Sequence, residues 1–248
     1  MALQGHGRVV RTAVLDHPPL VLLPPSEGKA TGGRRGSWEP DAGRFGALAE
    51  RRRQVIDALA SLGGGDERLL GVGGEHLLRA QSANSTLLGA PTLPAWRRYT
   101  GVVWEHLDPA TLEPVHRRRI VVVSGLLGLV RGDDPIPDYR LRMAASLAPL
   151  GRLSSWWRNE LSTALDRAAR RSFVIDLLPK EHRAAWRPTN VRGVRVELID
   201  RSGKPGGHFA KAAKGRLAGA LLRGDSHAVD TLETWHDDRF LLDVTPLP

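Results

Sequence analysis

The sequence predicts a mixed α/β protein, a single compact domain with a mixed sheet, flanking helices and a positively charged cleft. Two observations predict the fold class. Short apolar or β-branched runs at residues 20–23, 120–123 and 173–178 are typical of buried strands, and longer segments between them show helical periodicity. The charged cleft is inferred separately, from a formal net charge of +9 and a pI near 10.8.

The predicted strands are bounded by turn residues or by a change of pattern. Residues 20–23 end at Pro24-Pro25, and residues 120–123 form a central strand buried on both faces. Residues 173–178 form another buried strand, residues 191–200 alternate as a strand does, and residues 240–244 form the last strand.

The predicted helices cover residues 44–62, 67–81 with interruptions at the glycines 71 and 73–74, 153–169 and 209–222. Residues 126–130 are expected to form one helical turn, and residue 102 begins either a strand or a helix. Residues 31–43 are expected to form an exposed, mobile loop in which Trp38 is available to stack on a base. Residues 1–19 are expected to be a flexible extension of a domain that spans residues 20–248.

Composition narrows the class of protein. The chain has no cysteine, which excludes disulfides and thiolate chemistry, and its nine histidines show no metal-ligand spacing, so neither a metal nor a cofactor is expected. No apolar run approaches the roughly 20 residues that span a bilayer, and residues 1–19 lack the apolar core expected of a signal peptide. We therefore expect no membrane partner and a cytoplasmic location.

The basic residues are unevenly divided, with 31 arginines and five lysines. The positive charge favours an anionic partner, although a coding bias toward arginine would also raise it. The lysines are more informative because Lys29, Lys211 and Lys214 fall in two short motifs. An ammonium group is a compact charge suited to a phosphate oxygen or to proton transfer.

Two segments follow predicted strands directly, where open α/β sheets place their ligands. In the segment 124–141, a turn at Ser124 is expected to offer backbone N–H groups to a phosphate, with Arg131 and Arg140 beside it. The alternative is a structural turn with solvated arginines. In the segment 25–29, Glu27 and Lys29 are either a general acid/base pair or a surface ion pair.

Five motifs occur in order along the chain: LLPPSEGK at 22–29, YTG at 99–101, SGLLGLVR at 124–131, PxYRL at 137–141 and HFAKxxKGR at 208–216. Together they resemble the YaaA family of bacterial peroxide stress proteins. The resemblance implies one compact α/β fold with a basic cleft, a helix-hairpin-helix-like element and binding to duplex or distorted DNA. It also implies a link to limiting oxidative DNA damage by lowering free iron.

By motif position, the resemblance places eight residues on the cleft: Lys29, Tyr99, Arg131, Tyr139, Arg140, Lys211, Lys214 and Arg216. The sequence departs from the family pattern at Gly132, which follows Arg131, and at residues 176–182.

Three hypotheses follow. The first is a DNA-binding protein of the peroxide stress response. The second is an enzyme that acts on a phosphorylated or nucleotide-like small molecule in the same cleft, with Glu27, Lys29 and Lys211 as candidate catalytic residues. The third is an interaction protein whose basicity reflects coding bias, with arginines spread evenly over its surface.

Overall fold

A six-stranded mixed sheet forms the centre of the computed structural model, which describes residues 15–34, 37–202 and 207–248. The strand order is β10-β9-β8-β1-β3-β4. Strands β1, β3, β8 and β9 are mutually parallel, while β4 and β10 run antiparallel at the two edges. The strands are β1 (Leu20–Leu23), β3 (Ile120–Ser124), β4 (Gly128–Arg131), β8 (Val174–Asp176), β9 (Gly193–Asp200) and β10 (Phe240–Pro246).

The inner strands are apolar because helices cover both faces of the sheet. All residues of β1 and β3 are buried, as expected for strands of a parallel sheet. Two short ribbons lie outside the main sheet: β2 (Leu93–Pro94) pairs with β5 (Pro135–Ile136), and β6 (Ser146–Leu147) pairs with β7 (Gly151–Arg152).

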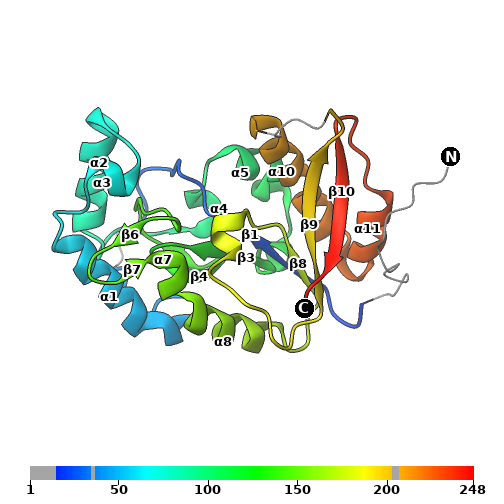
Figure 1. Cartoon of the computed structure of the whole chain (residues 1–248), viewed down its shortest axis with the longest axis horizontal. Coiled ribbons are helices and arrows are strands. Elements are labelled where there is room, and N and C mark those ends of the chain that lie inside the picture. Colours follow the sequence, from blue (N-terminus) through cyan, green and yellow to red (C-terminus); the bar gives the residue numbers. More distant parts are fainter. Residues whose placement is uncertain (1–14, 35–36, 203–206) are drawn as a thin grey trace.

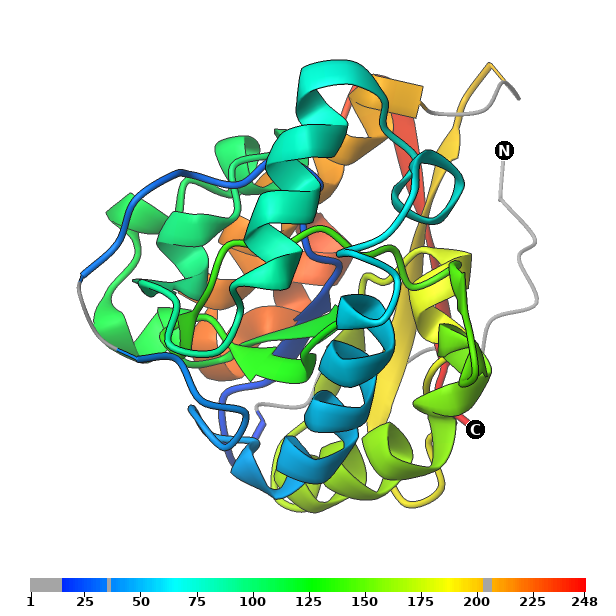
Figure 2. The same ribbon diagram turned by 90° about the vertical axis from the view of Figure 1, so that its left-hand side faces the viewer.

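Helices form the two outer layers. Helix α8 lies below the sheet in Figure 1, and α5 and α10 lie above it. The helices are α1 (Ala49–Ala60), α2 (Glu67–Leu70), α3 (Gly74–Ser85), α4 (Ala95–Arg98), α5 (Val102–Leu107), α6 (Pro114–Arg117), α7 (Leu153–Trp156), α8 (Arg158–Ala169), α9 (Lys180–Arg183), α10 (Gly207–Arg223) and α11 (Ala228–Thr234). Figure 2 shows α1 and α3 at the end of the molecule that carries β4.

Helices α5 and α10 approach each other closely because glycines lie at their contact. A Cβ added at Gly215 would lie 2.4 Å from the carbonyl oxygen of Val103 and 2.9 Å from the amide nitrogen of Leu107. Neither backbone atom can move aside as a flexible side chain does. Gly215 therefore sets the distance between the two helices.

The predicted mixed α/β fold is confirmed, with two local corrections. Residues 126–130 do not form a helical turn: they enter a hairpin, and β4 pairs with β3. Gly128 has a φ of 68°, and buried Arg52 donates hydrogen bonds to the carbonyls of Leu127 and Leu129. These contacts come from distant parts of the chain, so the local pattern does not reveal them.

Trp38 is not available to stack on a base, because its side chain is only 1% exposed. Its backbone N–H donates to the carbonyl of Ala90, and its carbonyl accepts from the N–H of Gly89. These bonds hold the backbone at Trp38, and the indole packs in the core.

The N-terminal extension lies largely outside the described residues. Of its described part, Leu15 is buried and its N–H donates to the carbonyl of Ser226. Among the helices that the structure describes, none is long and apolar enough to cross a membrane.

Candidate anion-binding site

The carboxyl ends of β1, β3, β8 and β9 meet at one edge of the sheet because these four strands are parallel. From β1 the chain first adds β3 on one side and later adds β8 and β9 on the other. The order therefore reverses between β1 and β8. Ligands of open α/β sheets bind in the crevice at such a point.

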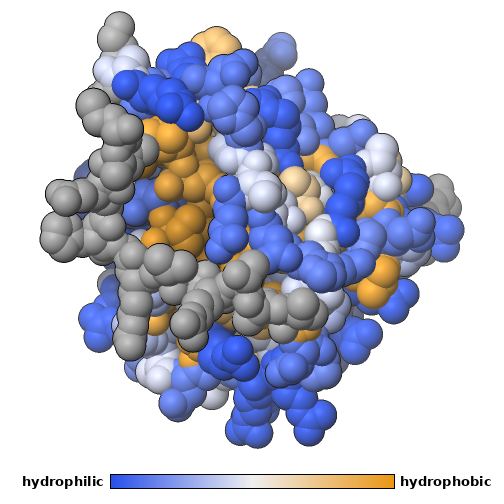
Figure 3. All heavy atoms as spheres, turned by 90° about the vertical axis from the view of Figure 1, so that its right-hand side faces the viewer, coloured by the Kyte–Doolittle hydropathy of each residue, from blue (hydrophilic) through white to orange (hydrophobic). Residues whose placement is uncertain are grey.

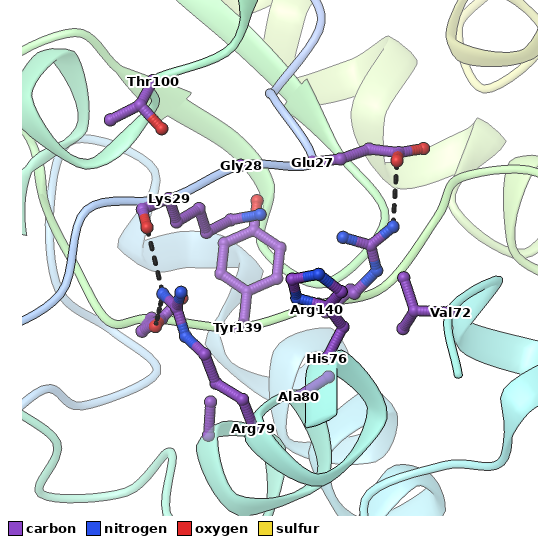
Figure 4. Close-up of a pocket in the computed structure, with 12 residues that line it drawn as sticks. Glu27, Gly28, Lys29, Val72, His76, Arg79, Ala80, Thr100, Tyr139 and Arg140 are labelled. Atoms are coloured by element: carbon purple, nitrogen blue, oxygen red, sulfur yellow. Dashed lines mark hydrogen bonds and ion pairs between the residues drawn. The ribbon is translucent and has the colours of Figure 1, made fainter. Parts of the chain in front are cut away.

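Three neighbouring cavities lie at this edge, and Glu27 lines all of them. We call them together the edge cleft. The first cavity, of about 540 Å³, is lined by Lys29, His76, Arg79, Asp138, Tyr139 and Arg140, among others (Figure 4). The second, of about 530 Å³, is lined by Lys180, Glu181, Lys211 and Lys214 together with apolar groups. The third, of about 340 Å³, shares Lys29 and Arg140 with the first and Glu181 with the second.

All four lysines of the described residues line the edge cleft: Lys29, Lys180, Lys211 and Lys214. Lys204 lies outside the described residues. In a chain with 31 arginines, this gathering of its rare lysines at one edge is the clearest feature of the site. Three of these lysines were predicted for the cleft from the sequence, and Lys180 was not.

Lys29 is held in the first cavity by the loop that follows β1. Its Nζ donates a hydrogen bond of 2.8 Å to the carbonyl of Ser26 and lies 4.1 Å from the centre of the Tyr139 ring. Burial is the main cause that lowers the pKa of Lys29 to about 7, and Arg140 adds to that effect, while Asp138 opposes it. A large fraction of this amine is therefore uncharged near neutral pH.

The Tyr139 hydroxyl connects three parts of the chain. It lies 2.7 Å from the Ser124 Oγ and 2.8 Å from the Tyr99 hydroxyl. The Ser124 Oγ also accepts from the N–H groups of Leu126 and Leu127, so its own proton is directed to Tyr139. Burial raises the pKa of Tyr139 to about 12.

This arrangement corrects the phosphate-binding turn predicted at Ser124. Ser124 is fully buried, and the N–H groups of residues 126 and 127 are directed at its own side chain. The turn therefore holds the Tyr139 hydroxyl through the Ser124 side chain, and these N–H groups are not offered to a ligand.

The carboxylates of the first cavity are paired with arginines. Glu27 lies 2.9 Å from Arg140, and Asp138 lies 3.0 Å from Arg79. The sequence proposed Glu27 and Lys29 as a pair, but Glu27 instead contacts Arg140, and no described carboxylate forms an ion pair with Lys29. Asn84 fixes the Arg140 backbone, because its amide both accepts from the N–H and donates to the carbonyl of that residue.

The second cavity contains a buried charge network beneath its lysines. Arg183 contacts fully buried Asp176 at 2.7 Å and Glu197 at 2.6 Å. The Nζ of Lys214 donates a 2.7 Å hydrogen bond to the carbonyl of Leu177, and burial lowers its pKa to about 8. Lys211, one helical turn earlier, is exposed.

Two of the predicted cleft residues lie elsewhere. Arg131 pairs in register with Val121, near the amino end of β3, and stacks over the ring of Phe45. Its strand runs antiparallel to β3, which carries it away from the edge cleft. Arg216 pairs with Asp237 at 2.7 Å and lines none of the three cavities. Tyr99 is buried beneath the site and acts through Tyr139.

Four residues of the site were not predicted from the sequence: His76 and Arg79 on α3, Asp138, and Lys180. The polar face of α3 has the same pattern as any solvated helix face, so only the packing of α3 beside the loop after β1 reveals its role. Asp138 directly precedes Tyr139 in the PxYRL motif, and this position is the feature of the sequence that could have indicated Asp138 as a site residue. No group of three His, Asp or Glu side chains within residues 15–34, 37–202 and 207–248 is placed to hold a metal ion.

The fold and site define an α/β protein with a lysine-bearing cleft at the carboxyl edge of its sheet, at the point where strand order reverses. The family model described as peroxide stress protein YaaA matches residues 20–245. The chain belongs to this family.

Individual relatives agree with that assignment. A UPF0246 protein of Streptomyces coelicolor is 38% identical over 215 residues, which cover 82% of each chain. A UPF0246 protein of Corynebacterium efficiens is 34% identical over 216 residues, which cover 84% of this chain and 87% of the relative. A UPF0246 protein of a Shewanella species is 32% identical over 147 residues, 55% of this chain and 57% of the relative.

Proposed function

We propose that this chain acts in the peroxide stress response as a DNA-binding protein, with the edge cleft as its contact surface for duplex or distorted DNA. The observation that carries the proposal is that the described lysines line that cleft and that two of them, Lys180 and Lys211, are exposed. Membership of the YaaA family supports the stress role.

The exposed cations of the cleft are the groups able to meet phosphates. Lys180 and Lys211 are exposed, and neither forms an ion pair with a described carboxylate. The nearby carboxylates are occupied, since Glu197 pairs with Arg183 and Glu181 faces His182. The positive charge of both lysines therefore remains available to a phosphate backbone.

Salt dependence tests this proposal. Each phosphate that the protein neutralises contributes about 0.9 to the slope of log affinity against log salt. The double variant Lys180→Gln/Lys211→Gln is expected to lower the slope for a duplex by roughly 2. Arg167→Gln is the control, because Arg167 is exposed in the last turn of α8, close to the amino end of β8, and its loss is expected to leave the slope unchanged. A double variant with the slope of the native protein would contradict the assignment.

A second candidate function, an enzyme of phosphorylated or nucleotide-like small molecules, is favoured by the first cavity. Its volume of about 540 Å³ suits a small molecule, while the Lys29 amine and the Tyr139 ring at its floor are buried beyond the reach of a duplex. Exposed Arg79 and half-buried Arg140 at its sides are able to bind an anionic group.

Thermal denaturation with a panel of nucleotides and phosphorylated metabolites tests the second candidate. We expect at least one compound to raise the melting temperature at micromolar concentration, with the effect lost in Arg140→Gln and kept in Arg167→Gln. If no compound of the panel raises the melting temperature and DNA binding depends on salt, the second candidate function is contradicted and only the first proposal stands.

A further inference from the structure

The Lys29 amine occupies its cavity without a counter-ion. Its Nζ has one hydrogen-bond acceptor, the carbonyl of Ser26, and one side is covered by the Tyr139 ring. The two nearest carboxylates, Glu27 and Asp138, are paired with arginines. The amine is therefore held in place without forming an ion pair. A lysine that acts as a nucleophile has this arrangement.

The protonation state agrees with that geometry. Burial is the largest cause that lowers the pKa of Lys29 to about 7, so near neutral pH a large share of the nitrogen carries a free electron pair. An arginine in its place would stay charged.

The cavity also has unused donors for an anion. Arg140 uses Nε for the carbonyl of Leu70 and one terminal nitrogen, Nη2, for Glu27. Arg79 uses Nη2 for both the Lys29 carbonyl and Asp138. The remaining N–H groups of both guanidiniums have no partner among the described residues. The view into the cavity in Figure 4 shows these two side chains on opposite sides of Tyr139, with Lys29 beside its ring.

We propose that Lys29 forms a reversible imine with a small aldehyde that carries a phosphate, the phosphate being held by Arg79 and Arg140. This rests on the second candidate function and names its substrate class. The uncharged Nζ attacks the carbonyl carbon and forms a C–N bond, and the carbonyl oxygen takes a proton to give a carbinolamine. That proton is the first of the two that Nζ gives up; the second joins the oxygen as the C–O bond breaks, so the oxygen leaves as water and C=N remains. No oxidant or reductant is involved.

Cyanoborohydride trapping tests the proposal on the full chain. The protein is incubated with glyceraldehyde 3-phosphate and sodium cyanoborohydride, which near neutral pH reduces an imine to a stable secondary amine in preference to the free aldehyde, and the modified lysines are located by mass spectrometry. We expect Lys29 to be labelled at least tenfold faster than exposed Lys180 or Lys211, with half-maximal rate near pH 7. Labelling of Lys29 no faster than these two would overturn the proposal.

The phosphate requirement is tested separately. Glu27→Gln frees Arg140, so it is expected to increase the preference for glyceraldehyde 3-phosphate over glyceraldehyde, and Arg140→Gln to reduce it, each by several-fold. Fast labelling of Lys29 with equal rates for both aldehydes would keep the nucleophile and contradict the phosphate contact. Stabilisation by glycerol 3-phosphate without any trapping would keep the second candidate function and contradict the imine.

Discussion

The Nζ of Lys29 lies 4.1 Å from the centre of the Tyr139 ring, and the hydroxyl of that ring is held by Ser124 at the carboxyl end of β3. The two residues come from loops more than 100 positions apart in the chain. Their contact joins the first and fourth of the sequence motifs into one site. The position of the amine thus depends on a hydrogen-bond network that reaches into the sheet.

Stability should depend on pH through Lys29. Its pKa is about 7 when folded and 10.5 as a free side chain, so between these values the unfolded chain binds more protons than the folded one. The free energy of unfolding therefore rises with pH across that window, by up to about 1 kcal/mol per pH unit. The destabilisation by the buried amine is complete below pH 7 and disappears above about pH 10.5. Urea denaturation from pH 7 to 10 is expected to show this slope reduced in Lys29→Met and retained in Lys211→Met. Parallel curves for the native protein and Lys29→Met would refute the lowered pKa.

Removal of the Tyr139 hydroxyl should cost more stability than removal of the Tyr99 hydroxyl. In Tyr139→Phe both Ser124 and Tyr99 lose a partner, whereas in Tyr99→Phe only Tyr139 does. Each buried hydroxyl left unpaired costs about 1–3 kcal/mol. Chemical denaturation of the two variants gives the order, and a larger loss in Tyr99→Phe would contradict the network.

The pair between Arg183 and Asp176 should contribute strongly to stability. Asp176 is fully buried, and Arg183 is its charged hydrogen-bond partner at 2.7 Å. Arg183→Met leaves that carboxylate unpaired and is expected to destabilise the fold by about 3 kcal/mol or more. Arg79→Met, which breaks the more exposed pair with Asp138, is expected to cost less than about 1 kcal/mol. Equal losses in the two variants, measured by denaturant unfolding, would argue against the buried pair.

The contact between α5 and α10 should tolerate a methyl group at one glycine and not at the other. At Gly215 the new Cβ would meet backbone atoms of α5, and overpacking of this kind costs about 1–3 kcal/mol. At Gly219 its nearest neighbour, at 2.9 Å, is a terminal nitrogen of the long Arg223 side chain, and the carbonyl oxygen of Leu107 lies at 3.3 Å, not 2.4 Å as at Gly215. Alanine also favours the helix by about 1 kcal/mol. Gly215→Ala is expected to lower the melting temperature and Gly219→Ala to leave it nearly unchanged. The reverse order would show that α10 contacts α5 in another register.

Most strands of the sheet could be predicted from the sequence, because strands buried on both faces have a strong apolar pattern. The prediction failed at residues 126–130, where five apolar or glycine residues fit a helical turn and a strand equally well. The strand is favoured by hydrogen bonds from Arg52, a residue far away in the sequence, and by the left-handed backbone at Gly128. The apolar pattern of residues 126–130 reveals neither of them. The prediction for Trp38 was also wrong. The composition of its loop indicated an exposed side chain, but the indole is buried and the backbone of Trp38 is hydrogen-bonded to Ala90 and Gly89.

The candidate site was predictable in part for a similar reason. Lysine scarcity identified Lys29, Lys211 and Lys214 as residues of interest, and the parallel sheet brings them to one edge. Arg131 was placed in the cleft by its position after a predicted strand and by its motif, and both missed the hairpin that reverses the chain after β3. Arg79 and His76 were missed because α3 joins the site through tertiary packing alone.

Differential amine labelling is the most direct test of the proposal that the edge cleft contacts DNA. The protein is treated with an amine-reactive ester, with and without a saturating DNA duplex, and the labelling of each lysine is measured by mass spectrometry. If the edge cleft holds the DNA, Lys180 and Lys211 are protected several-fold by the duplex. Unchanged labelling of both lysines, under conditions where binding is complete, would contradict the account.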